Sequence, residues 1–243
     1  MVFEVCRTAF EYKDDRGNVF EGVLCKPKNL VGKTPGVLVY HTFAGCTDFE
    51  ASRAAKLAEL GYIALAADVY GKGIRGKSFE ENFSIMKPLI AERGTTLKDR
   101  LFCSLNALKS VENVLDDKIA AIGYCFGGLC AMDLGRHGSG IVAAVSYHGT
   151  LTPLGDNERN AVITTFQVHH GAEDSHITQK SIVDFQQEMR DRKADWSFTS
   201  HGNAYHGFTE PHIDSFNLPT LKYNKEADVR SWAATVALFS EKF

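Results

Sequence analysis

The sequence lacks the features of a membrane protein or a nucleic-acid-binding protein. None of its 243 residues belongs to an uninterrupted apolar run approaching the roughly 18 residues that span a bilayer. Its 27 basic residues are outnumbered by 30 acidic ones, which gives a net charge of −3, and no basic run stands out. We therefore expect neither a nucleic-acid partner nor a membrane partner.

The sequence also lacks the marks of a secreted or metal-binding protein. Its first residues, MVFEVCRTAFEYKDD, contain no basic segment followed by an apolar stretch, so we expect no signal peptide. There is no C-x-x-C pair and no cysteine-histidine group at zinc spacing. The cysteines are therefore predicted to be free thiols in the cytoplasm, without a metal: Cys6, Cys25, Cys46, Cys103, Cys125 and Cys130.

The apolar pattern is typical of one α/β domain covering 1–243. Hydrophobic residues make up 44% of the chain, enough for one large core. Apolar and β-branched runs predict strands at 3–12, 19–25, 36–40, 62–67, 119–122, 141–147, 161–168 and 196–199. Helical spacing predicts helices at 48–60, 78–92, 97–115, 126–136, 177–192 and 225–243.

The order of these elements predicts an α/β-hydrolase-like architecture. The turn residues at 14–18 indicate an N-terminal antiparallel hairpin. From residue 36 onward strands alternate with helices, which favours a mainly parallel central sheet with helices on both faces. Ligands in such sheets bind beyond the carboxyl ends of the strands. We therefore expect the site among the loops at 41–46, 68–73, 123–128, 169–176 and 201–210.

Cys125 occupies the segment around which the chain is organised. A short apolar strand leads into Gly123-Tyr124-Cys125-Phe126-Gly127-Gly128, and good helix formers follow. Small residues two positions before and after a nucleophile, between a strand and a helix, form a nucleophile elbow, here with Cys in place of Ser. Gly-rich turns of this kind also bind phosphates, but this one lacks the G-x-G-x-x-G spacing and the P-loop lysine.

An acid and a base for Cys125 follow in the order used by α/β hydrolases. Asp174 lies in the loop after the strand at 161–168 and is the predicted acid, with Glu173 as its close rival. Asp174 could instead cap the next helix, a role that Ser175 also suits. His206 lies in a Gly-flanked loop after the last strand and is the predicted base. His201 is nearer the strand end and has less reach.

An oxyanion hole needs two N–H donors close to the nucleophile. Phe126, the residue after Cys125, is predicted to supply one of them. Thr42 or Phe43, in the loop after the strand at 36–40, is available for the other. The segment that contains them could also be an ordinary polar strand end.

With these pieces in place, the chain resembles the dienelactone hydrolase family of α/β hydrolases over about residues 8 to 242. The resemblance is carried by the Cys125 elbow, Asp68-Val69-Tyr70-Gly71, Asp174 and Tyr205-His206-Gly207-Phe208. It implies a Cys125–His206–Asp174 triad, oxyanion donors from Phe126 and a residue near Thr42, and no metal or organic cofactor. The residues that it suggests as lining the site are His41, Phe43, Tyr70, Tyr124, Tyr205 and Phe208.

Two departures from the family pattern bear on the substrate. The family's founding members carry a Glu at the end of the first parallel strand, where this chain has His41, which could itself contact Cys125. They also carry an Arg a few residues after the catalytic His, where this chain has Glu210. The substrate is therefore not expected to be the anionic dienelactone. The sequence does not place Arg75, Arg93 or Arg100 in that role.

The predicted function is hydrolysis of a small ester, lactone or enol-lactone through a covalent thioester. A thioesterase or acyl transferase could use the same triad. A non-catalytic, redox-sensing binding protein is the alternative from another class. The sequence leaves open whether the chain is a monomer or a homodimer.

Overall fold

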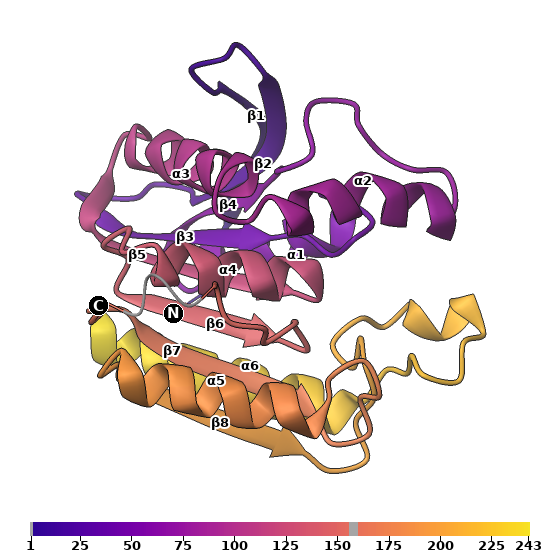
Figure 1. Ribbon diagram of the computed structural model, residues 1–243. Helices are drawn as coiled ribbons and strands as arrows, with labels where there is room; N and C mark the ends of the chain where they lie inside the picture. The colour runs from indigo at the N-terminus through magenta and orange to yellow at the C-terminus, as the bar shows by residue number, and fades with distance from the viewer. Residues whose placement is uncertain (1, 156–159) are drawn as a thin grey trace. The chain divides into compact units, whose positions relative to one another are not determined.

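The computed structural model describes residues 2–155 and 160–243 (Figure 1). Its eight strands belong to one mostly parallel sheet with an antiparallel N-terminal hairpin, and the predicted fold class is confirmed. The chain comprises two compact units, Met1–Ile122 and Gly123–Phe243. The single domain stays a prediction.

The first unit is built on a mixed group of strands. β1 (Val5–Lys13) and β2 (Val19–Pro27) form the antiparallel hairpin, seen in indigo in Figure 1. β2 also pairs antiparallel with β4 (Ile63–Ala67), and β4 runs parallel to β3 (Thr34–Tyr40). The remaining elements are the helices α1 (Asp48–Glu59), α2 (Phe79–Ala91) and α3 (Thr96–Lys109), and the strand β5 (Val114–Tyr124), whose last two residues belong to the second unit.

The second unit contains three parallel strands. They are β6 (Ala143–Tyr147), β7 (Thr165–Gly171) and β8 (Trp196–His201), paired in that order. Its helices are α4 (Phe126–Arg136), α5 (Gln179–Asp191) and α6 (Lys225–Lys242), and a short 3₁₀ helix spans Ile213–Phe216.

Helices cover both faces of the sheet in the second unit, as predicted. Successive side chains of a strand point to opposite faces. The Tyr147 hydroxyl hydrogen-bonds Thr235 of α6 at 2.6 Å, whereas the side chain of the preceding residue, Ser146, points at Gly128 of α4. α4 and α6 therefore lie on opposite faces of β6.

A buried ionic group joins α4 to α5 in the second unit. The Glu188 carboxylate accepts hydrogen bonds from Arg136 and from Arg192, each at 2.9 Å. Arg136 also donates to Asp133 at 3.0 Å. All four side chains are almost completely buried, so each charge depends on its partners for compensation.

Several boundaries differ from the sequence prediction, among them the end of α3 and the end of β7. The helix expected at 97–115 ends at Lys109, and Asn113 adopts a left-handed φ of 72° before β5 begins at Val114. The apolar residues 111, 114 and 115 fit a helical spacing but lie in a turn and a strand. β7 reaches Gly171, so His169 and His170 lie in the strand rather than in the expected loop. No helix in the described part of the chain is long and apolar enough to cross a membrane.

Candidate active site

Cys125 lies on a strained turn between β5 and α4. Its backbone has φ 54° and ψ −114°, a conformation that costs a non-glycine residue about 1–3 kcal/mol. A Cβ on Gly123 would lie 1.9 Å from the Gly127 carbonyl oxygen, so only glycine fits there. The Cys125 N–H donates to the Tyr147 carbonyl at 3.0 Å, which fixes the turn to the end of β6. This is the geometry of the predicted nucleophile elbow.

Asp174 and His206 meet through a direct hydrogen bond. Nδ1 of His206 lies 2.8 Å from Oδ2 of Asp174, whose side chain is fully buried. The backbone N–H of His176 donates to the other carboxylate oxygen at 2.9 Å. Glu173, the rival acid, is exposed and contributes its backbone N–H to Ala204 instead. Asp174 is thus the carboxylate that orients the His206 ring.

Gly171 brings the two loops together, and sequence reasoning missed it. A Cβ at this position would lie 2.5 Å from the Ala204 carbonyl oxygen and 2.8 Å from that of Tyr205. The end of β7 therefore touches the segment that precedes His206. This close approach sets the distance between Asp174 and His206. A glycine shortly after the end of the predicted strand at 161–168 was the signal of it in the sequence.

Charge around His206 favours its protonated form. Burial lowers the pKa of His206, but the charge of Cys125, the hydrogen bond to Asp174 and a hydrogen bond to the Cys125 side chain together raise it well above the usual value. Burial raises the pKa of Asp174, and the hydrogen bond and charge of His206 outweigh that effect, so the net shift is downward. The two shifts therefore favour an imidazolium at His206 and a carboxylate at Asp174.

Two further histidine rings flank His206, and neither was selected from the sequence. His148 is buried and lies edge-on to His206 at 5.2 Å between ring centres, and its Nε2 is 2.8 Å from the Thr209 hydroxyl. The ring of His176 lies 4.8 Å from His206. His201 instead bonds His169 at 3.3 Å. The neighbours of His206 depend on tertiary structure, and so the local sequence does not reveal them.

The predicted lining residues of the second unit differ in accessibility. Phe208 is fully buried and packs on the rings of His148 and His201. Tyr124 is also fully buried and stacks on Tyr147 with 4.7 Å between ring centres. Tyr205 is half-buried. Tyr124 and Phe208 thus support the loops that carry the site.

The loop after β3 holds the candidate residues of the first unit. The Thr42 N–H donates to Glu50 at 3.1 Å, and Glu50 also accepts from the backbone and the hydroxyl of Thr47. His41 is fully buried; its Nδ1 lies 2.6 Å from the Thr42 carbonyl oxygen, and burial lowers its pKa to about 4. The Tyr70 hydroxyl donates to the Phe43 carbonyl at 3.0 Å.

Comparison with known proteins decides the family. The model of the dienelactone hydrolase family matches residues 20–243. The chain belongs to the dienelactone hydrolase family. The resemblance seen in the sequence is confirmed, and the chain is an enzyme of the carboxylic ester hydrolase class.

Relatives of this dienelactone hydrolase family member cover most of its length. A crystal structure of a dienelactone hydrolase-like promiscuous phosphotriesterase, P91 from metagenomic libraries, is 33% identical, with a TM-score of 0.94 over 98% of this chain and 99% of that one. A Synechocystis protein named as a carboxymethylenebutenolidase is 26% identical over 235 residues, 90% of each chain. An uncharacterised Caenorhabditis elegans protein is 41% identical over 164 residues, 64% of this chain and 99% of its own.

The arginines considered for substrate binding in this dienelactone hydrolase family member have intramolecular partners. Arg75 donates to Asp68 at 3.4 Å and to the Ile74 carbonyl at 2.6 Å. Arg100 donates to the carbonyl oxygens of Val69 and Tyr70 at 2.7 and 2.9 Å. Both guanidinium groups serve to hold the loop after β4.

The His, Cys, Asp and Glu side chains of the described residues do not indicate a metal site. No group of three or more His, Cys, Asp or Glu side chains within residues 2–155 and 160–243 is arranged to hold a metal ion. All six cysteines are free thiols. Burial raises the pKa of Cys103 to about 11, so that thiol differs chemically from one paired with a histidine.

Proposed function

We propose that the chain hydrolyses a small ester, lactone or enol-lactone through a Cys125–His206–Asp174 triad and a thioester acyl-enzyme. One observation carries the proposal: His206 lies between the Cys125 side chain and the buried Asp174 carboxylate, with its pKa raised. Family membership supports the reaction class.

Acylation would use the ion pair of Cys125 and His206. The thiolate attacks the substrate carbonyl carbon, and a carbon–sulfur bond forms. When the tetrahedral intermediate collapses, the carbon–oxygen bond to the alcohol breaks, and the His206 imidazolium gives that oxygen its proton. Asp174 keeps the ring oriented through Nδ1. In a lactone the alcohol stays attached to the acyl chain.

Deacylation would reverse the roles of the same groups. Neutral His206 takes a proton from water, whose oxygen attacks the thioester carbonyl. The carbon–sulfur bond breaks, the carboxylic acid leaves, and the thiolate and imidazolium are restored. A thiolate leaves more readily than an amine, which favours esters and lactones over amides as substrates. The reaction needs no cofactor.

The oxyanion donors are part of the proposal. Phe126 is the first residue of α4, where backbone N–H groups and the helix dipole favour negative charge. For the second donor the sequence offers Thr42 or Phe43. Because the Thr42 N–H donates to Glu50, Phe43 suits the role better.

The substrate is proposed to be neutral. Glu210 lies one turn after His206, its N–H bonded to the Gly207 carbonyl at 2.9 Å, so this turn carries an acidic side chain. The hydrogen bonds that Arg75 and Arg100 make within the first unit speak against their replacing the family's Arg. A neutral ester should therefore react faster than its analogue with a carboxylate arm.

A paired assay tests the proposal. The native protein, Cys125→Ser and the control Cys103→Ser are assayed with p-nitrophenyl acetate, a neutral enol-lactone and an acyl thioester. We expect Cys125→Ser to lose at least about 100-fold in kcat/KM and Cys103→Ser to retain full activity. Iodoacetamide should inactivate the native protein in step with alkylation of Cys125.

The same set of substrates also distinguishes the proposed hydrolase from the alternative functions. A preference for the thioester over the oxygen esters would assign a thioesterase or acyl transferase. A phosphotriester tests the activity described for the P91 relative. No turnover of any compound, with Cys125 alkylated no faster than Cys103, would reject the hydrolase and favour the redox-sensing binding protein.

A further inference from the structure

β1 presents an open sheet edge. It is the first strand in the order of the sheet, and one side pairs with β2 along all nine residues. No strand in the described residues pairs with its other side. The middle of β1, from Cys6 to Ala9, is exposed. Such an edge is a template for another strand.

The hydrogen bonds that flank the hairpin show which backbone groups face outward. Lys28 N–H donates to the Glu4 carbonyl at 2.7 Å, and Asp14 N–H donates to the Asn18 carbonyl at 3.1 Å. In an antiparallel ladder every second residue bonds the same neighbour. The even-numbered residues of β1 therefore bond β2. The N–H and C=O groups directed to the open edge belong to Val5, Arg7, Ala9, Glu11 and Lys13.

We propose that this edge is a homodimer interface, in which β1 of a second copy pairs antiparallel about a two-fold axis at Ala9. In this register the residues with outward-directed backbone groups face one another. Arg7 lies opposite the partner's Glu11, and the same pair recurs on the other side of the axis. Val5 lies opposite the partner's Lys13. The arrangement uses the whole strand and forms about ten interstrand hydrogen bonds.

Charge distinguishes this register from its neighbours. An axis at Arg7 or at Glu11 sets like charges against each other across the strands, which is unfavourable. A slip of the register that brings Arg7 opposite the partner's Lys13 also sets two positive charges against each other. A slip in the other direction sets Arg7 against the partner's Ala9 and leaves both ions unpaired. Among the registers that pair most of the strand, only the axis at Ala9 sets opposite charges against each other, which is why a second copy is the occupant that we propose.

The ion pairs already present leave room for this contact. Arg7 lies 3.9 Å from Asp48, and both side chains are well exposed. Lys72 contacts Glu11 through Oε1 and also pairs with Glu21, so Oε2 of Glu11 remains for the partner's Arg7.

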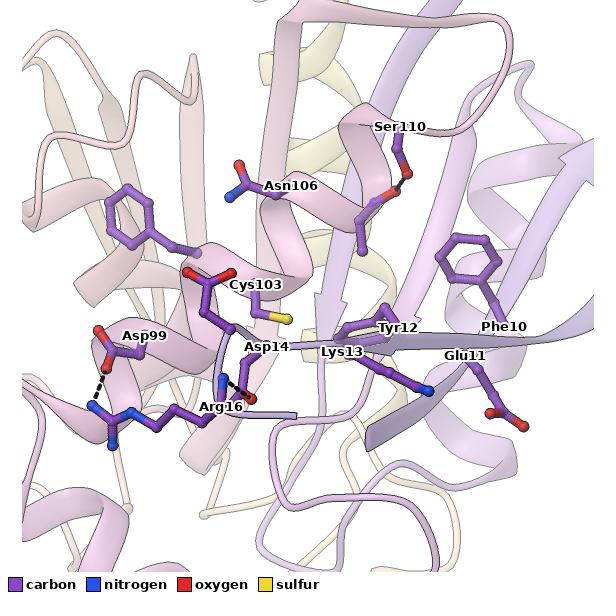
Figure 2. Close-up of a pocket in the computed structure, with 13 residues that line it drawn as sticks. Phe10, Glu11, Tyr12, Lys13, Asp14, Arg16, Asp99, Cys103, Asn106 and Ser110 are labelled. Carbon is purple, nitrogen blue, oxygen red and sulfur yellow. Dashed lines mark hydrogen bonds and ion pairs between the residues drawn. The ribbon is translucent and has the colours of Figure 1, made fainter. Parts of the chain in front are cut away.

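The side of β1 that faces α3 adds surface of mixed polarity to the interface. Phe10 and Glu11 point to opposite sides of the strand, and Phe10 lies on the side of Cys103 and Asn106 (Figure 2). An open cavity of about 680 Å³ lies here, lined in part by Phe10, Phe102 and Cys103. In the proposed register the partner's Phe10 lies opposite Thr8, beside this cavity, and covers part of it.

Sedimentation velocity across a range of protein concentrations tests the interface. We expect a dimer for the native chain, and at least about tenfold weaker association for Arg7→Glu and for Glu11→Arg. The double variant Arg7→Glu/Glu11→Arg restores the opposite charges and should restore the dimer. Lys26→Glu, on β2, makes the same change in net charge as Arg7→Glu and should not affect association.

Ala9→Pro tests the backbone pairing separately. The Ala9 N–H faces outward, so proline removes a donor of the open edge without removing a bond to β2. We expect a monomer with the melting temperature and esterase activity of the native chain at low concentration. In hydrogen exchange, the amides of Arg7, Ala9 and Glu11 should be protected in the native dimer and unprotected in Ala9→Pro.

Three results would overturn the inference. The first is a native chain that is monomeric at about 100 µM, a concentration well above the Kd of a specific dimer. The second is a dimer whose association is unaffected by Arg7→Glu and Ala9→Pro. The third is a double variant Arg7→Glu/Glu11→Arg that stays monomeric. Rapid exchange of these three amides in a dimer would place its interface elsewhere on the molecule.

Discussion

The ring of His148 stands edge-on to the ring of His206, with 5.2 Å between their centres and an interplanar angle of 64°. His148 is itself fixed by the Thr209 hydroxyl at 2.8 Å and by its backbone N–H, which donates to the His169 carbonyl at 2.8 Å. Its backbone has a left-handed φ of 42°. His148 is therefore placed to position the proposed base without touching the substrate.

Replacing His148 should impair the chemical step more than substrate binding. His148→Asn removes the ring, and asparagine tolerates the left-handed backbone. Aromatic pairs contribute about 0.5–1.5 kcal/mol, so we expect kcat to fall by roughly three- to tenfold. KM should hardly change, and the pH profile of kcat/KM should shift. A variant with a lower melting temperature but native kcat and pH profile would show that His148 is only structural.

Alkylation of Cys125 should depend little on pH. The raised pKa of His206 favours its protonated ring, and in the proposed ion pair Cys125 is the matching thiolate. We expect the iodoacetamide rate at Cys125 to change by less than about threefold between pH 6 and 8. The rate at Cys103, whose pKa is raised to about 11, should rise about 100-fold over the same range. Mass spectrometry of the alkylated peptides measures both rates.

Asp174→Asn provides the control for that experiment. It removes a charge that helps to raise the pKa of His206. The alkylation rate at Cys125 should then become pH-dependent, while that of Cys103 stays the same. An unchanged, flat profile in this variant would contradict the role given to Asp174.

Glu188 should matter far more to stability than an exposed carboxylate on the same helix. Glu188→Gln leaves Arg136 and Arg192 buried with less compensating charge. Loss of one partner from a buried pair costs about 3–5 kcal/mol. Asp184 pairs with Lys180 on the exposed side of α5, and Asp184→Asn should cost less than about 0.5 kcal/mol. Urea unfolding of the two variants measures the difference, and equal losses would contradict the assignment.

Acid should destabilise the fold through His169. Burial and the nearby His201 lower the pKa of His169 to about 3. Above pH 6.5 the ring is neutral in both the folded and the unfolded state, so it has no effect on stability. As the pH falls below 6.5, only the unfolded chain takes up the proton, which favours unfolding until the pH passes the folded-state pKa.

The size of this effect follows from the same pKa values. Between pH 7 and pH 5 the free energy of unfolding should fall by about 2 kcal/mol because of this group. His169→Gln removes the titration, so its stability should fall less over that range. Urea unfolding at the two pH values compares the native chain with the variant. Equal pH slopes would show that His169 does not contribute.

The sequence predicted the parts of the site that depend on local pattern. The bounds of α4, 126–136, match because the glycines around Cys125 leave little freedom in where the helix begins. Asp174 and His206 could be chosen because their order and strand-end loops are features of the chain itself. In the structure Asp174 hydrogen-bonds His206, and its catalytic role stays a prediction.

Other features of the site could not be predicted from the local sequence pattern. The packing of His148 on His206, and of Gly171 on the loop before His206, joins segments far apart in the chain. The hydrogen bond from the Thr42 N–H to Glu50 joins a strand end to helix α1. The sequence showed only the apolar spacing of that helix and gave no sign of this bond. At residues 110–115 the apolar spacing fitted a helix, whereas the structure has a turn there that leads into the start of β5 at Val114.

Gly128 of the elbow helix and Gly149, which follows His148, approach each other backbone to backbone. A Cβ on Gly128 would lie 2.9 Å from the Gly149 Cα, and a Cβ on Gly149 would lie 2.8 Å from the Gly128 Cα and 3.0 Å from the Cys125 carbonyl oxygen. Neither position can compensate for a change at the other, because both must lack a side chain. As sequences diverge, the two glycines should therefore persist together rather than covary, and they limit how far evolution can alter the backbone packing around Cys125.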